Sequence, residues 1–282
     1  MRANGKNEGS ETMRLEGKIA LVTGGSHGIG KAIALTFARE GADVAITYRG
    51  REEGARGTAR QIEALGRRVL VRHAEMTDLD DCPRVVDEVI RDLGGLDVLV
   101  NNAGGGRGDA LLDLTVDDWR YTIDLCVSAP FVLGQRAARH MAEHGGGAIV
   151  NISSVHSDHV WTNDTAYGVA KAGLNRLTKS MAVEWARFGI RANTIAPGYI
   201  DISETPEEQA RYDATDGGAA PWIVAQRTAR PTEIADVALF LASDAASYVN
   251  GQTIFVDGGL LLPAITTADY MKGDRSGRGF SG

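Results

Sequence analysis

Short apolar runs alternate with longer segments of helical period along most of this chain. Seven runs have the length and composition of strands, namely 18–23, 43–48, 68–74, 96–100, 148–153, 190–196 and 252–256. Six segments carry apolar residues at helical spacing, namely 28–40, 51–65, 78–93, 117–144, 164–188 and 232–243. This alternation predicts an α/β fold, a single doubly wound domain whose seven-stranded parallel sheet has helices on both faces.

Three segments depart from the alternation. Residues 1–13 are polar and lack the apolar stretch of a secretory signal, so we expect a disordered N-terminal extension before a domain of residues 14–259. Residues 201–230 hold prolines and glycines between a strand and a helix, which favours a partly helical, movable lid over the substrate. Residues 260–282 form a Gly-rich, charged C-terminal tail.

Composition narrows the class of function. The chain has 30 basic and 37 acidic side chains, a formal charge of −7, and no long block of like charge. This balance argues against nucleic-acid or membrane partners and favours a small-molecule substrate. Cys82 and Cys126 are too few and too far apart for a disulfide framework or a zinc motif. We therefore expect a cytoplasmic protein without a metal site, and no run approaches the ~18 apolar residues of a membrane span.

Three polar side chains are spaced so that they could protonate a carbonyl oxygen. Tyr167 and Lys171 are four residues apart in a helical segment, and Ser154 follows the apolar run 148–152. A positive charge about 4 Å from a phenol supplies ~4 kcal/mol at an effective dielectric constant of ~20, enough to make the phenol a much stronger acid. The same spacing also occurs on amphipathic helices that bury a tyrosine ring and extend a lysine to solvent. A second motif is needed to decide between a catalytic pair and an ordinary amphipathic helix.

That motif is a glycine-rich turn, Thr23 to Gly30, between the first strand and the first helix. Glycines let a turn tighten and let the backbone approach a pyrophosphate, whose charge the helix N-terminus favours. The alternative is an ordinary turn that binds no pyrophosphate. Residues 24–28 also match G-x-S-x-G, which would make Ser26 an esterase nucleophile. That hypothesis lacks an upstream strand for the oxyanion hole, and His159 is the last histidine in the chain.

Together with 101–104, Asn-Asn-Ala-Gly, these motifs make the chain resemble the short-chain dehydrogenase/reductase family from about residue 15 to 259. The resemblance implies a Rossmann-type sheet and nicotinamide-dependent interconversion of carbonyls and alcohols, usually in a homotetramer. It assigns catalysis to Ser154, Tyr167 and Lys171, and treats Asn151 as structural. It also implies cofactor contacts from a larger set: Gly24, Ser26, His27, Gly28, Ile29, Gly30, Tyr48, Arg49, Glu75, Met76, Asn102, Ala103, Gly104, Tyr167, Lys171, Pro197, Gly198 and Ile200.

Two positions depart from the family pattern. Cys126 stands where relatives usually have an active-site asparagine that supports a water-linked proton relay to the lysine. A cysteine keeps the backbone carbonyl but loses the amide, which predicts a weaker or rerouted relay. Ile202 stands where many relatives place a threonine for the carboxamide, and Ser203 follows it. The acid and its lysine are retained.

Charge at the end of the second strand bears on the choice of cofactor. NAD-selective sites place a carboxylate there for the ribose diol, whereas a 2′-phosphate needs a cation. This chain has Tyr48 followed by Arg49, and His27 in the glycine turn could assist. We predict NADP(H) as the preferred cofactor and NAD(H) as the second choice, the alternative being an arginine solvated at a strand end.

The substrate is left open between two classes. The segment from Ser153 to His156 is similar to sugar dehydrogenases of the glucose 1-dehydrogenase type, and the overall plan equally suits 3-oxoacyl carrier-protein reductases. His156 and Trp161 are candidates for a polar substrate pocket, although loops are commonly polar without binding anything. A non-enzymatic alternative, motivated by Cys126, is a dinucleotide-binding sensor or scaffold.

Overall fold

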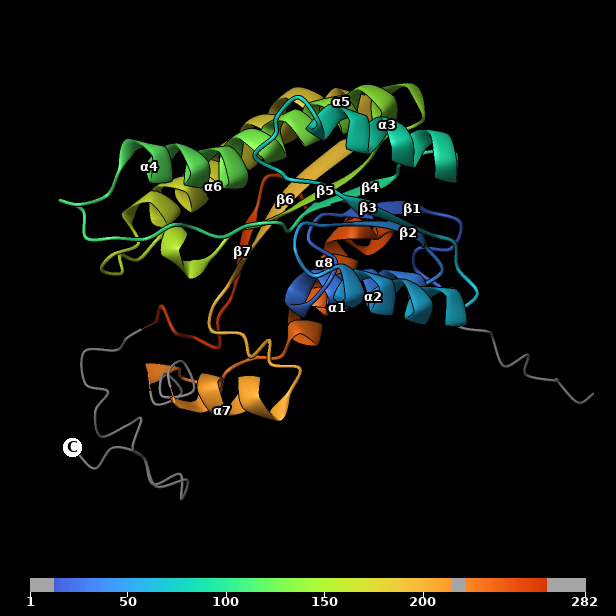
Figure 1. The fold of residues 1–282 in the computed structure, drawn as a ribbon. Coiled ribbons are helices and arrows are strands. Elements are labelled where there is room, and N and C mark those ends of the chain that lie inside the picture. The colour runs from blue at the N-terminus through green and yellow to red at the C-terminus, as the bar shows by residue number, and fades with distance from the viewer. Residues whose placement is uncertain (1–12, 215–221, 263–282) are drawn as a thin grey trace, which may run out of the picture.

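Seven parallel strands form one sheet with helices on both faces (Figure 1). The structure is a computed structural model, and it describes residues 13–214 and 222–262. The strands are β1 (Ile19–Val22), β2 (Asp43–Tyr48), β3 (Val69–His73), β4 (Val98–Asn101), β5 (Gly147–Ile152), β6 (Ile190–Pro197) and β7 (Thr253–Val256). The helices are α1 (Gly28–Arg39), α2 (Glu52–Ala64), α3 (Cys82–Leu93), α4 (Val116–Ile123), α5 (Ala129–Glu143), α6 (Thr165–Trp185), α7 (Pro206–Ala214) and α8 (Pro231–Ala242).

The strand order is β3-β2-β1-β4-β5-β6-β7, and every pair is parallel. The order reverses at β1, which pairs with β2 on one side and with β4 on the other. Chains that leave β1 and β4 therefore separate at the carboxyl edge of the sheet and open a crevice there. The predicted doubly wound fold with seven parallel strands is confirmed.

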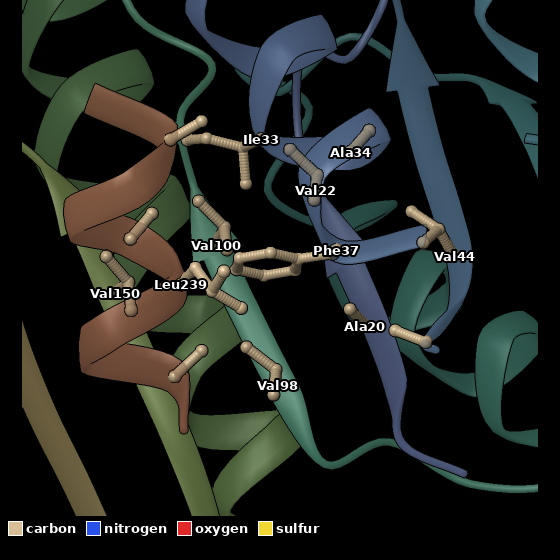
Figure 2. Packing of buried hydrophobic residues seen from close by; sticks show 14 of the residues in the cluster. Ala20, Val22, Ile33, Ala34, Phe37, Val44, Val98, Val100, Val150 and Leu239 are labelled. Carbon is tan, nitrogen blue, oxygen red and sulfur yellow. The ribbon is translucent and has the colours of Figure 1, made fainter. Parts of the chain in front are cut away.

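Helices α1, α2 and α8 cover one face of the sheet (Figure 1). Phe37 of α1 is fully buried between Leu239 of α8 and the valines of β1, β2 and β4 (Figure 2). Ile33 lies one turn earlier on the same side of α1, so the two side chains form one apolar stripe. Truncating a buried phenylalanine to alanine typically costs roughly 3–5 kcal/mol. This packing fixes the position of α1, whose first turn borders the crevice.

Helices α3, α5 and α6 cover the opposite face (Figure 1). Val85 and Val89 of α3 lie in the same core cluster as Leu133 and Met141 of α5, and all four are buried. None of the helices in the described ranges combines the length and apolarity needed to cross a membrane.

Two predicted helices differ from the observed ones. The segment predicted as one helix over 117–144 is divided into α4 and α5 by a π-helical segment, η1 (Asp124–Ser128). A π segment adds a residue to one turn, which apolar spacing does not reveal. The helix predicted from 78 begins at Cys82, because Pro83 in its first turn favours a helix start there and Asp78 forms a preceding turn.

The segments predicted to lie outside the regular alternation are covered only in part. Helix α7 lies within the segment predicted as a lid, while residues 215–221 of that segment lie outside the described ranges. Residues 1–12 of the predicted extension and residues 263–282 of the predicted tail also lie outside them.

Candidate active site

A cavity of about 900 Å³ lies at the carboxyl edge of the sheet, where β1 and β4 diverge. Most of the residues predicted from the sequence line it: Gly24, Ser26, His27, Gly28, Ile29, Gly30, Tyr48, Arg49, Glu75, Met76, Asn102, Ala103, Gly104, Ser154, Tyr167, Lys171, Pro197, Gly198 and Ile200. Cys126, His156 and Trp161 are not part of its wall. The volume is within the usual range for cofactor and substrate pockets, ~300–1,000 Å³.

The glycine turn forms one side of the cavity. Gly24 has a φ of +69°, which a residue with a side chain rarely adopts. A Cβ on Gly30 would lie 2.2 Å from the carbonyl oxygen of Gly24, so the helix can approach the turn only because Gly30 has no side chain. The N-terminus of α1 therefore faces the cavity with unpaired N–H groups, as a pyrophosphate requires. Ser26 is buried in this turn, so the esterase hypothesis lacks an exposed nucleophile.

The loop after β4 braces the glycine turn. The Oγ1 of Thr23 accepts hydrogen bonds from the backbone N–H groups of Asn102 and Ala103, each at 2.9 Å. The side-chain amide of Asn102 donates to the carbonyl oxygens of Thr23 and Gly24 at 2.8 and 3.2 Å. The two segments that flank the switch in strand order are thus fixed to each other.

A buried hydrogen-bonded chain joins β4, β5 and α6 behind the cavity. Asn101 donates to Asn151 at 2.8 Å, and Asn151 donates to Thr178 at 2.8 Å. All three side chains are buried. These contacts give Asn151 a structural position, as the sequence indicated, and they set the height of α6 relative to the strand that precedes Ser154.

Tyr167 and Lys171 share one side of α6 on the cavity wall, and Ser154 follows β5 beside them. Lys171 is 2% exposed, and its Nζ donates to the carbonyl oxygen of Ile152 at 2.8 Å. The same Nζ lies 5.3 Å from the centroid of the Tyr167 ring. Among the described residues Lys171 joins no ion pair. The site therefore places a buried cation, which is hydrogen-bonded to backbone, beside a phenol in the cavity wall.

His156 and Trp161 pack around Tyr167 outside the cavity wall. The His156 ring meets the Tyr167 ring edge-on, with 5.4 Å between the ring centroids. The ring centroids of Trp161 and His156 are 4.2 Å apart. Nδ1 of His156 is 2.7 Å from a carboxylate oxygen of Asp164. Burial lowers the pKa of His156 below its usual value, although the charge of Asp164 opposes this. A direct substrate contact by His156 or Trp161 stays a prediction.

Cys126 is buried within the π-helical segment η1, on the side of Lys171. Its Sγ donates to the carbonyl oxygen of Gly105 at 3.2 Å. A Cβ on Gly104 would lie 3.1 Å from Nζ of Lys171 and 3.9 Å from Sγ of Cys126, so both side chains border the same glycine. The thiol therefore stands near the ammonium without reaching the cavity, and its predicted effect on a proton relay stays a prediction.

The charged side chains at the end of β2 are already engaged with other elements. Arg49 donates to the hydroxyl of Tyr121 on α4 and lies 3.5 Å from Glu75. Arg51 lies 3.6 Å from Glu208 of α7. The pKa of His27 in the glycine turn is lowered, first by burial and then by the charge of Arg51. The cations at the end of β2 are thus paired with carboxylates from other elements, Glu75 after β3 and Glu208 on α7.

Sequence reasoning did not assign a site role to several residues that line the cavity. Arg51, Arg107 and Tyr121 are part of the wall. Ile202, which was assigned from the sequence to the family's carboxamide position, also lines the cavity, against Gly28. The run of glycines before Arg107 was a usable signal, because a backbone without side chains lets the following residue reach the cavity. Tyr121 gave no such signal, since its contacts come from residues distant in sequence.

Comparison with known proteins identifies the family. A family model described as Enoyl-(Acyl carrier protein) reductase matches residues 24–261. The chain is 40% identical over 250 residues to 3-oxoacyl-(acyl-carrier-protein) reductase FabG of Thermotoga maritima, covering 89% of this chain and 100% of that protein.

Solved structures agree with this match. Acetoin dehydrogenase from Enterobacter cloacae has a TM-score of 0.81 and 40% identity, covering 89% of this chain and 98% of that one. A blue fluorescent protein from a metagenomic library, in complex with NADPH, has a TM-score of 0.81 and 35% identity, covering 88% of this chain and 99% of that one. The chain therefore belongs to the short-chain dehydrogenase/reductase family of NAD(P)-dependent oxidoreductases.

Proposed function

We propose that this protein is an NADP(H)-preferring oxidoreductase that interconverts a carbonyl and a secondary alcohol, with Tyr167 as general acid and base. The observation that carries the proposal is that Ser154, Tyr167 and Lys171 line the same cavity as the glycine turn. A dinucleotide fits this cavity because Gly24 and Gly30 leave the turn without side chains and α1 begins beside it. When bound, the nicotinamide cofactor supplies or accepts the hydride.

The side chains divide the proton chemistry between them. In reduction, the hydroxyl of Tyr167 donates its proton to the substrate oxygen, and the charge of Lys171 stabilises the phenolate that remains. Ser154 donates a second hydrogen bond to the same oxygen, which orients the carbonyl. In oxidation the phenolate accepts the proton of the alcohol. Lys171 is held for this role by the carbonyl oxygen of Ile152.

The preference for NADP(H) is supported by charge at the end of β2. Arg49 and Arg51 both line the cavity there, and no carboxylate occupies the strand end itself. An arginine fork suits a phosphate better than a ribose diol. We expect Arg49→Gln to reduce the ratio of kcat/KM with NADPH to kcat/KM with NADH by roughly tenfold to a hundredfold, as for loss of a charge-assisted hydrogen bond. Wild-type protein that uses both cofactors equally contradicts the preference.

For the substrate we keep two classes, 3-oxoacyl thioesters and sugars or polyols. The similarity to FabG supports the first class, and the segment from Ser153 to His156 supports the second. A direct test measures NADPH oxidation with ketones, acetoin and oxoacyl thioesters, and NADP⁺ reduction with sugars and polyols. Tight cofactor binding without turnover of any of these compounds would favour the alternative, a dinucleotide-binding sensor or scaffold.

We also propose that the protein is a cytoplasmic homotetramer without nucleic-acid or membrane partners. Exposed apolar side chains on three elements support the tetramer. Val169 and Val183 of α6 are 48% and 80% exposed, and Phe255 of β7 and Phe240 of α8 are 40% and 36% exposed. Such side chains suit burial between subunits. Light scattering that gives the mass of a monomer contradicts this assembly. The free thiols of Cys82 and Cys126 suit a reducing compartment.

A further inference from the structure

Five side chains form a continuous line of contacts beside the ends of β2 and β3, and four of them line the cavity. In spatial order they are Asp118, Arg107, Tyr121, Arg49 and Glu75, which we call the charged strap. They come from four elements, namely α4, the loop after β4, and the ends of β2 and β3. Residues so distant in sequence meet only because the parallel strands end at the same edge of the sheet.

Each neighbouring pair in the charged strap is in contact. Arg107 lies 3.2 Å from Asp118, and its guanidinium lies 4.0 Å from the centroid of the Tyr121 ring. On the other side, Arg49 donates to the Tyr121 hydroxyl and lies 3.5 Å from Glu75. Tyr121 is therefore the central member, with one arginine against its ring and another at its hydroxyl.

The cavity has apolar walls next to the charged strap, because Ala74 and Met76 flank Glu75 in the sequence. Ala74, Met76 and Ala103 line the cavity at the ends of β3 and β4. The Arg49 side chain is 59% exposed, so it lies at the mouth and not in the interior. Apolar side chains and a planar guanidinium thus line the same part of the cavity, which we call the slot, and such groups suit a flat aromatic base.

We infer that Tyr121 is a positioning residue for cofactor binding, whose hydroxyl holds Arg49 across the mouth so that its guanidinium closes over the adenine base. The inference rests on dinucleotide binding in this cavity and extends it to a residue outside the glycine turn. The Tyr121 hydroxyl accepts from Arg49 and so keeps its own proton for a further acceptor. The cation of Arg107 against the ring limits the movement of the phenol.

Glu75 alone cannot hold Arg49 in the same way. Glu75 and Arg49 follow neighbouring strands on one side of the mouth, whereas Tyr121 stands on α4. Without the Tyr121 hydroxyl, Arg49 keeps only its ion pair with Glu75, which follows the neighbouring strand. Its guanidinium is then no longer held across the mouth of the cavity. The slot then opens, and the bound nucleotide leaves faster.

The experiment compares Tyr121→Phe with wild-type full-length protein, using 5′-AMP and adenosine 2′,5′-bisphosphate as probes in calorimetric titrations. We expect both probes to bind roughly threefold to tenfold more weakly in the variant, as for loss of one hydrogen bond, and NADPH to dissociate faster by a similar factor. In the Arg49→Met background, Tyr121→Phe should have almost no further effect, because its partner is already absent. Tyr248→Phe, at a fully exposed tyrosine, is the matched control and should change neither affinity.

The outcomes separate this inference from the proposed function. Unchanged binding of both probes to Tyr121→Phe overturns the inference while leaving NADP(H) chemistry intact. Additive effects of Tyr121→Phe and Arg49→Met, or weaker binding of the bisphosphate alone, also overturn it. If wild-type protein binds both probes equally, the preference for NADP(H) fails and the role of Tyr121 stands. Wild-type protein that binds neither probe contradicts both. Thermal melts without ligand check that each variant is folded.

Discussion

The two halves of the cavity differ in the groups that form them, because one is mainly backbone and the other is mainly side chains. The glycine turn, Thr23 to Gly30, presents mainly backbone groups to the cavity, and its glycines leave no room for added side chains. The other half, which we call the catalytic wall after its proposed role, consists of the polar side chains Ser154, Tyr167 and Lys171. An added atom should therefore disrupt the first half, whereas a removed atom should disrupt the second. Each half can be tested with a substitution that leaves the other unchanged.

Removing one oxygen from the catalytic wall should have the largest effect. In Tyr167→Phe the ring stays in contact with His156 and Lys171, but the proton donor is lost. We expect kcat to fall by about 10²–10⁴-fold, the usual contribution of general acid catalysis, while the Kd for NADPH changes by less than about twofold. Steady-state kinetics and fluorescence titration measure the two quantities. A variant that keeps its kcat would remove Tyr167 from the proposed mechanism.

Adding one carbon to the glycine turn should have the next largest effect, and it should act on binding. In Gly30→Ala the new Cβ would lie 2.2 Å from the Gly24 oxygen and 2.4 Å from the Asn102 side-chain nitrogen. The turn or the helix must move, which typically costs roughly 1–3 kcal/mol for an overpacked site. We expect the Kd for NADPH to rise by about tenfold or more and the thermal midpoint to fall.

Gly57 provides the matched control for this test. It also lies within a helix, α2, but the nearest atom to an added Cβ is the end of the Arg60 side chain at 3.7 Å. Gly57→Ala should leave binding unchanged and stabilise the protein by up to ~1 kcal/mol, because alanine favours helix. Equal behaviour of the two alanine variants would contradict the account of the glycine turn.

The elements of the fold could be predicted closely because apolar spacing determines them locally. The strand predicted over 43–48 was found with the same bounds, and the strand predicted over 96–100 was found at Val98–Asn101. The break between α4 and α5 was missed, because a π segment continues the helix and shifts the apolar spacing by only one residue. The start of α3 was placed four residues early, although Pro83 was a visible signal.

The site could be predicted where a motif is contiguous in sequence. The glycine turn and the pair Tyr167 and Lys171 lie within single segments, and they meet at one cavity as expected. The setting of Arg49 could not be predicted, because its partner Tyr121 is 72 residues away in sequence. The side of Tyr167 on which His156 packs was likewise beyond sequence reasoning, since it depends on how the loop after β5 folds back.

The smallest expected effect concerns pH and again compares the two halves. His27 in the glycine turn and His156 beside Tyr167 both have a lowered pKa, for which burial is the main cause. Each folded-state imidazole thus resists protonation more than its unfolded counterpart, whose pKa is about 6.5. The stability associated with each group is complete above that value and is lost as pH falls through it toward the folded-state pKa.

For His156, the nearby charges make this prediction specific. Asp164 raises its pKa and Lys171 lowers it, so Asp164→Asn should lower the pKa of His156 further and increase the loss of stability in acid. His156→Asn should reduce that loss, because the group that resists protonation is gone. Urea unfolding at about pH 7.5 and about pH 5 measures both, with the difference between the two values as the readout. If Asp164→Asn instead made the protein less sensitive to acid, the carboxylate and not the imidazole would dominate the titration of this pair.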